Sequence, residues 1–115
     1  MRRGEIRLVD LDPVRGSEAN KQRPAVIVSN DGANQSAERL GRGVVTVVPV
    51  TSNVTRLFPF QVLLAATDTG LRVNSKAQAE QVRSVAVERI GARVGVVPPS
   101  TLTLLDDALR LHLAL

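Results

Sequence analysis

The sequence predicts an α+β fold that is mainly β: a small antiparallel, barrel-like sheet with a short internal helix and a C-terminal helix. Short β-branched runs such as 44–50 lie between Gly-, Pro- and Asn-rich segments, which is typical of buried strands joined by turns. Asn30 and Pro98 stand where helices begin. With 115 residues, we expect one domain over residues 1–115.

The apolar runs and turn residues define the expected strands. Pro24 fits the first position of its strand, where a missing N–H is tolerated. Turns are expected at 12–13, 41–43 and 67–70, and the longest polar loop at 14–22. The predicted strands are 5–10, 24–29, 44–50 and 60–65, then one or two within 76–86, and 89–97.

Two helices are predicted. Asn30 caps a short helix that runs to about Leu40, and a terminal helix runs from Pro98 to Leu115. The terminal helix has two apolar stripes, so it needs cover on more than one side, which predicts core packing plus a subunit interface. The stripes are Leu102, Leu105, Leu109 and Leu113, and Leu104, Ala108 and Leu111.

Composition limits the possible functions. The net charge is +4 and 13 of the 15 cationic residues are Arg, which favours a polyanionic partner. Phe58 and Phe60 are the only aromatic residues, and we expect both in the core. A row of aromatic rings that stacks bases is therefore excluded.

The absence of Cys excludes disulfides and thiolate metal sites and fits a reducing cytoplasm. No apolar segment follows Met1–Arg3 as in a secretory signal, and no apolar stretch is long enough to cross a bilayer. We expect a cytoplasmic protein that does not bind a membrane.

Several catalytic chemistries are also missing. His112 is the only His and lies among leucines, so neither a two-His ribonuclease nor a His-based triad can be assembled. No HExxH, Walker or dinucleotide pattern appears, and Asp106 and Asp107 face different directions on a helix. Catalysis must come from carboxylates, Arg and hydroxyl groups, and we expect no metal or other cofactor.

Residues 16–24 carry the most distinctive chemistry. Pro24 forces Arg23 into an extended conformation at the entrance of a strand, and Glu18 lies on the loop before it. A guanidinium on a rigid edge that faces a loop carboxylate suits a phosphodiester.

These residues belong to a series of fragments that runs along nearly the whole chain. The fragments are Arg3-Gly4-Glu5-Ile6, 10–13, Gly16-Ser17-Glu18, 22–29, 48–52, 58–62 and 79–84. In this order they resemble the MazF/PemK family of toxin endoribonucleases from type II toxin–antitoxin modules. One departure is Arg7, where the family usually has Trp or Tyr.

The resemblance implies an SH3-like barrel that forms a homodimer. It implies cleavage of single-stranded RNA at short sequences without metal, by attack of the 2′-OH, with 2′,3′-cyclic phosphate and 5′-OH ends. It also implies growth inhibition and silencing by a cognate MazE-like antitoxin.

The resemblance also assigns roles to individual residues. Arg23 is the expected catalytic Arg at the scissile phosphate, and Thr51 is a hydroxyl donor. Glu18 is the expected general base, and without it Arg23 would have to share the proton transfer. The expected RNA-binding residues are Ser17, Lys21, Ser52, Asn53, Arg56, Gln81 and Arg83.

Two alternatives stay open. One is a CcdB-like toxin that poisons gyrase without cutting RNA, and the other is a non-catalytic RNA-binding relative. Both predict that the protein cleaves no RNA.

Overall fold

The computed structural model describes residues 1–11 and 22–115. The described strands are β1 (Glu5–Asp10), β2 (Gln22–Ile27), β3 (Val44–Thr51), β4 (Gln61–Leu64), β5 (Ser75–Gln78), β6 (Arg83–Ala86) and β7 (Ile90–Val96). The helices are α1 (Asp31–Leu40), α2 (Ala66–Thr69) and α3 (Pro99–Leu113), with 3₁₀ turns η1 (Ala79–Gln81) and η2 (Val87–Arg89). None of these helices has both the length and the apolar character that crossing a membrane requires.

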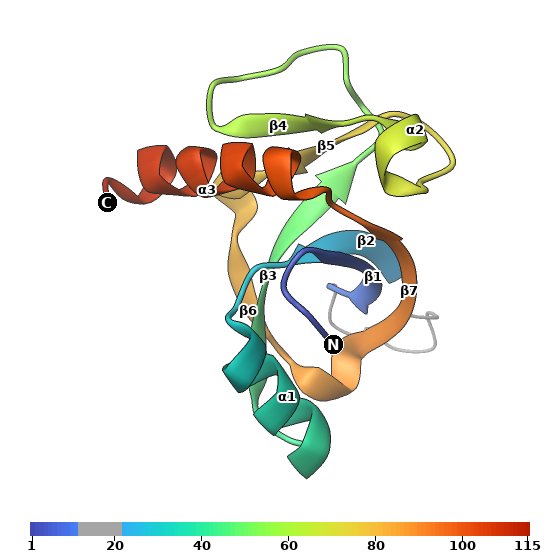
Figure 1. Ribbon diagram of the computed structural model, residues 1–115, viewed down its shortest axis with the longest axis vertical. Coiled ribbons are helices and arrows are strands. Elements are labelled where there is room, and N and C mark those ends of the chain that lie inside the picture. Colours follow the sequence, from blue (N-terminus) through green and yellow to red (C-terminus); the bar gives the residue numbers. More distant parts are fainter. Residues whose placement is uncertain (12–21) are drawn as a thin grey trace, which may run out of the picture.

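The described strands form one curved antiparallel sheet in the order β4-β5-β3-β2-β1-β7, and β6 also pairs with β3 (Figure 1). One edge of β3 changes partner along its length, because Val44–Val47 pair with β6 and Val50–Thr51 pair with β5. The opposite edge of β3 pairs with β2. The mixed fold with a C-terminal helix is confirmed. The sheet does not close, since β4 and β7 end it, and the SH3-like barrel stays a prediction.

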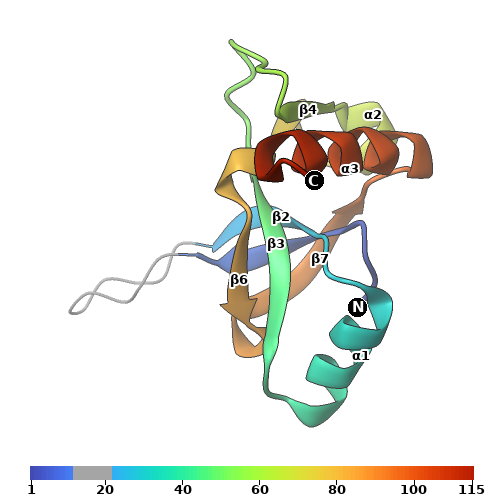
Figure 2. The same cartoon turned by 90° about the vertical axis from the view of Figure 1, so that its left-hand side faces the viewer.

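The sheet is buried on both faces, which explains the unbroken apolar runs in β2 and β3. Val26 and Val48 pack with Leu105 in a core cluster beneath α3. Their neighbours Ile27 and Val47 point the other way, into a second cluster that includes Ala37 of α1. Figure 2 shows α3 and α1 at opposite ends of the molecule. Each fully buried Val, Leu or Ile contributes about 1.5–3 kcal/mol of transfer free energy.

The expected cap of α1 is confirmed. The side chain of Asn30 accepts a hydrogen bond from the Ala33 N–H at 2.8 Å, and Gly41 ends the helix with φ +65°. Asn34 is fully buried and donates to the Ser29 carbonyl oxygen at 2.8 Å. The Ser29 hydroxyl in turn accepts from the Thr46 N–H at 3.0 Å, which fastens α1 to β3.

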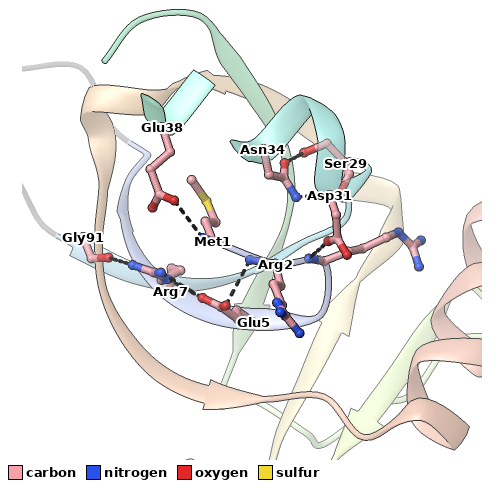
Figure 3. A network of polar contacts seen from close by, with 10 residues as sticks. Met1, Arg2, Glu5, Arg7, Ser29, Asp31, Asn34, Glu38 and Gly91 are labelled. Atoms are coloured by element: carbon pink, nitrogen blue, oxygen red, sulfur yellow. Dashed lines mark hydrogen bonds and ion pairs between the residues drawn. The ribbon is translucent and has the colours of Figure 1, made fainter. Parts of the chain in front are cut away.

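Arg7 lies in a network of polar contacts (Figure 3). Its guanidinium forms an ion pair with Glu5 at 2.8 Å and donates to the Gly91 carbonyl oxygen at 3.0 Å. Burial raises the pKa of Glu5, but hydrogen bonds from Arg7 and from the Arg2 N–H, with nearby positive charge, leave this pKa below its ordinary value of 4.5. Arg7, which stands where the family usually has Trp or Tyr, thus links β1 to β7.

Two expectations need correction. Residues 67–70 were predicted as a turn, but residues Ala66–Thr69 form the short helix α2, which Gly70 ends with φ +85°. In α3 the buried face contains Leu105 and Ala108, flanked by Leu102 and Leu109, so it draws on both predicted stripes. Leu104, Leu111 and Leu113 are exposed because the sheet covers only one side of the helix.

Candidate active site

Arg23 and Thr51 come together at the ends of two adjacent strands. Ala25 of β2 pairs with Pro49 of β3, and the same antiparallel register continued by two residues sets Arg23 opposite Thr51. Arg23 is exposed and Thr51 is half-buried. Because Pro24 fixes the backbone beside it, Arg23 starts from a rigid part of the sheet.

Two pockets meet at this pair. The first, here named the Gln81 pocket, has a volume of about 360 Å³. Its lining consists of Leu11, Arg23, Pro49, Val50, Thr51, Gln78, Gln81 and Arg83. The second, here named the Arg72 pocket, has a volume of about 550 Å³. Arg23, Val50 and Thr51 line both pockets and form the wall between them.

The Gln81 pocket unites four of the predicted site residues. Gln81 comes from η1 and Arg83 from β6, so side chains from distant parts of the sequence join Arg23 and Thr51. The pocket presents amide, hydroxyl and guanidinium groups. No Asp or Glu is among the described residues that line either pocket, so these linings are positively charged.

The Thr51 hydroxyl is oriented by the backbone that follows it. Its Oγ1 accepts a hydrogen bond from the Asn53 N–H at 3.2 Å. A hydroxyl has one donor and two acceptor positions, so the Thr51 proton can still donate to a ligand oxygen.

The remaining predicted residues of this region lie on the loop 52–60. Ser52 lines the Arg72 pocket. The Asn53 side chain accepts from the Thr55 N–H at 3.2 Å and shapes the loop, and neither Asn53 nor Arg56 lines the two pockets. Ser17, Glu18 and Lys21, predicted as functional, lie outside the described residues.

Lys76 holds this loop and was not predicted. It pairs with Thr51 in the β3–β5 ladder, is only 7% exposed, and donates from Nζ to the Arg56 carbonyl oxygen at 2.7 Å. Its neighbours Ser75 and Ala77 give no apolar pattern that marks the position as buried, so no local signal could have found it.

The prediction that both Phe residues belong to the core was wrong. Phe58 is 38% exposed, and its ring stacks on Phe60 with centroids 5.4 Å apart. Neither residue is part of the two core clusters. The Arg56 guanidinium lies 5.5 Å from the centroid of the Phe58 ring, within the range of a cation–π contact.

The residues excluded from catalysis lie elsewhere. His112 is exposed near the end of α3, and Asp106 forms an ion pair with Arg3. Within the described part of the chain, no group of three His, Cys, Asp or Glu side chains is arranged to hold a metal ion.

A comparison with family models decides the relationship. Residues 2–113 match the model described as PemK-like, MazF-like toxin of type II toxin–antitoxin system. The chain belongs to this family. The resemblance found in the sequence fragments is therefore confirmed, and with it the expectation of a MazF-family toxin endoribonuclease.

Individual relatives agree with this membership. The chain is 67% identical over 115 residues to Endoribonuclease MazF9 of Mycobacterium tuberculosis, covering all of this chain and 98% of the relative. It is 30% identical to Endoribonuclease MazF of Staphylococcus epidermidis, over 100% of this chain and 92% of the relative.

A solved structure gives the same relationship in three dimensions. An endoribonuclease in complex with its cognate antitoxin from Mycobacterial species superposes with a TM-score of 0.78. It is 25% identical to this chain and is matched over 100% of this chain and 96% of the other.

Proposed function

We propose that the wall between the two pockets, at Arg23 and Thr51, is where this MazF-family toxin endoribonuclease holds the scissile phosphate of single-stranded RNA. The observation that carries the proposal is the register that brings a guanidinium and a hydroxyl donor together between two pockets, whose lining within residues 1–11 and 22–115 contains no carboxylate. A phosphodiester chain that crosses this wall places one nucleotide on each side of it.

The reaction follows from the donors that this wall offers. The 2′-oxygen of the RNA attacks the adjacent phosphorus, a new 2′-O–P bond forms, and the P–O5′ bond breaks. Negative charge grows on the non-bridging oxygens, where Arg23 offers several N–H donors and Thr51 one O–H donor. The products are a 2′,3′-cyclic phosphate and a 5′-OH end.

Proton transfer needs a base and an acid. Glu18 takes the proton from the 2′-OH as the base, and solvent water gives a proton to the departing 5′-oxygen as its bond breaks. The nucleophile belongs to the RNA itself, so the proposed mechanism uses no metal. DNA, which lacks the 2′-OH, is not cleaved.

Base choice is assigned to the Gln81 pocket and the surrounding loops. Gln81 offers an amide that can read base edges, and Arg83 can pair with a phosphate or a base acceptor. Ser17, Lys21, Ser52, Asn53 and Arg56 complete the proposed RNA-binding set.

The partners and setting of the toxin are part of the same proposal. A cognate MazE-like antitoxin binds the toxin, as the antitoxin complex of the solved relative supports. Its extended acidic segment covers the positively charged linings of the two pockets. Cleavage of cellular RNA in the cytoplasm then inhibits translation and growth.

We further propose the architecture in which this occurs. The chain is one domain with an SH3-like barrel as its core, supported by the curvature of the sheet and by a family model that spans residues 2–113. Two copies form a homodimer through the exposed leucines of α3, which are Leu104, Leu111 and Leu113.

The test is cleavage of a long single-stranded RNA and a DNA of the same sequence, both in EDTA. We expect discrete RNA fragments with cyclic phosphate ends, intact DNA, and a loss of about 10²–10³-fold in rate for Arg23→Ala and for Thr51→Ala. Arg42→Ala, an exposed Arg in the turn after α1, is the control and retains full activity.

Two results would contradict the proposal. Full activity of both site variants would remove the assignment of Arg23 and Thr51. No cleavage by the folded, antitoxin-free wild type would favour a gyrase poison or a non-catalytic RNA-binding protein, which gyrase inhibition and RNA-binding assays would distinguish.

A further inference from the structure

The Arg72 pocket contains a cation that the proposed chemistry does not use. The pocket interior is mostly apolar, formed by Leu8, Pro24, Val50, Leu71, Val73 and Val94. Polar groups from Arg23, Thr51, Ser52, Arg72 and Ser75 complete the lining. A volume of about 550 Å³ falls within the range of pockets that bind small organic groups.

The segment that carries Arg72 is fixed by its neighbours. Thr69, at the end of α2, is only 5% exposed, and its Oγ1 accepts from the Leu71 N–H at 3.2 Å. On the C-terminal side of Arg72, the Asn74 side chain accepts a hydrogen bond from the Ala66 N–H at 2.9 Å, which fixes Asn74 to the start of α2. Arg72 therefore lies between two anchored positions.

Arg72 itself is exposed and forms no ion pair or hydrogen bond with the side chains or backbone described in residues 1–11 and 22–115. A guanidinium with neither a carboxylate nor a carbonyl partner remains able to form bidentate bonds to an added anion. Arg23 lines the same pocket.

This combination matches one repeating unit of a nucleic acid strand. A nucleoside consists of a flat, largely apolar base and a hydroxyl-bearing sugar. Within a strand, a phosphate joins it to the neighbouring nucleoside on each side. The pocket offers an apolar interior, hydroxyl groups from Thr51, Ser52 and Ser75, and two guanidinium groups.

We infer that the Arg72 pocket binds the nucleoside next to the scissile phosphate, and that Arg72 pairs with the phosphate on the far side of that nucleoside. The inference rests on the proposed function, which places the scissile phosphate at Arg23 and Thr51. Arg72 thus acts as a phosphate contact outside the reacting bond and sets where the strand lies.

The test uses short RNA substrates in which one phosphate at a time is replaced by an uncharged methylphosphonate. For the wild type, we expect loss of cleavage efficiency of about tenfold at one phosphate, one nucleotide away from the scissile bond. Arg72→Ala should show a similar loss with ordinary RNA, expressed mainly in KM, and no further loss when that same phosphate is neutral.

Two additional measurements address the pocket itself. The logarithm of the RNA binding constant falls linearly with the logarithm of the salt concentration. For Arg72→Ala the slope of this line should be shallower by about 0.7, as expected for the loss of one phosphate contact to a single strand. An abasic nucleotide between the scissile and the coupled phosphate should weaken cleavage by wild type and Arg72→Ala alike. Arg42→Ala is the control and should behave as the wild type.

The outcomes separate this inference from the proposed function. The wild type could cleave RNA while the loss of cleavage efficiency caused by Arg72→Ala is the same for ordinary RNA and for every methylphosphonate substrate. Arg72 would then contact none of these phosphates, so the inference would be wrong while the proposed function stands. If Arg72→Ala cleaves RNA normally but is inhibited less by the antitoxin, the pocket serves a protein partner, which also overturns it. A wild type that cleaves no RNA contradicts the proposed function itself.

Discussion

Gly95 of β7 lies directly against Thr69 of α2. A Cβ placed on Gly95 would come within 2.6 Å of the Thr69 carbonyl oxygen, a distance that the packed structure cannot accommodate without movement. Because the opposing atom is backbone, a side-chain rotation cannot relieve the clash. The absence of a side chain at Gly95 therefore determines how close α2 packs to the sheet.

Gly95→Ala should lower the free energy of unfolding by about 1–3 kcal/mol, because the added methyl group overpacks the contact. Urea unfolding followed by circular dichroism measures this change. Gly32→Ala, in the first turn of α1, is the matched control and should be neutral or slightly stabilising, since its Cβ has space of ordinary contact distance. Equal stability of Gly95→Ala and the wild type would contradict the close contact.

Lys76→Met should disturb the loop 52–60 more than the core. Met has a similar length but cannot donate to the Arg56 carbonyl oxygen, so the loop loses the anchor opposite Thr51. We expect a loss of about 1 kcal/mol in stability and a higher KM for RNA. Leu63→Met, at the exposed cross-strand neighbour of Lys76, should change neither quantity. An unaltered KM in Lys76→Met would show that the loop position does not depend on this hydrogen bond.

Glu5 should make stability depend on pH in the acid range. Its folded pKa lies below the ordinary 4.5, so its contribution is present above pH 4.5 and is lost as the pH falls through the folded pKa. Glu5→Gln should therefore be less stable than the wild type at pH 7, by about 1 kcal/mol. The difference should narrow below pH 4.5 in urea unfolding experiments. A difference that stays constant down to pH 3 would rule out the link to the Glu5 charge.

Leu111→Asp should weaken the proposed homodimer. Leu111 is 58% exposed on the face of α3 that the sheet leaves uncovered, and a charge there would be desolvated in an interface. Sedimentation velocity at micromolar concentration should report a monomer. Leu40→Asp on α1, where the side chain is equally exposed, should remain dimeric. A dimeric Leu111→Asp variant would exclude this face as the interface.

Much of the fold could be predicted from local signals. The strand at Glu5–Asp10, the Asn30 cap and the terminal helix were found because apolar periodicity and capping act over a few residues. The helix α2 was missed because Thr67–Gly70 has the composition of a turn, and tertiary packing of Thr69 decides its conformation.

The candidate site was harder to predict, because its residues are brought together by strand register. No local pattern indicates that Arg23 faces Thr51, or that Gln81 and Arg83 join them. These positions were found only through the resemblance to a family. Lys76 and Arg72 were missed because the role of each follows from what lies across the sheet or pocket.

The pairing of β1 with β7 has a consequence for synthesis on the ribosome. β1 pairs with β2, which carries Arg23, and on its other edge with β7. Since β1 ends at Asp10 and β7 begins at Ile90, this second pairing must wait until most of the chain has been translated. Strand pairing between residues so far apart in the sequence also forms slowly, because closing the long intervening segment costs entropy. A nascent chain therefore cannot hold the sheet in its final curvature while β7 is still within the exit tunnel. The sheet that carries Arg23 can therefore be completed only after β7 has been translated, when most of the chain has been made.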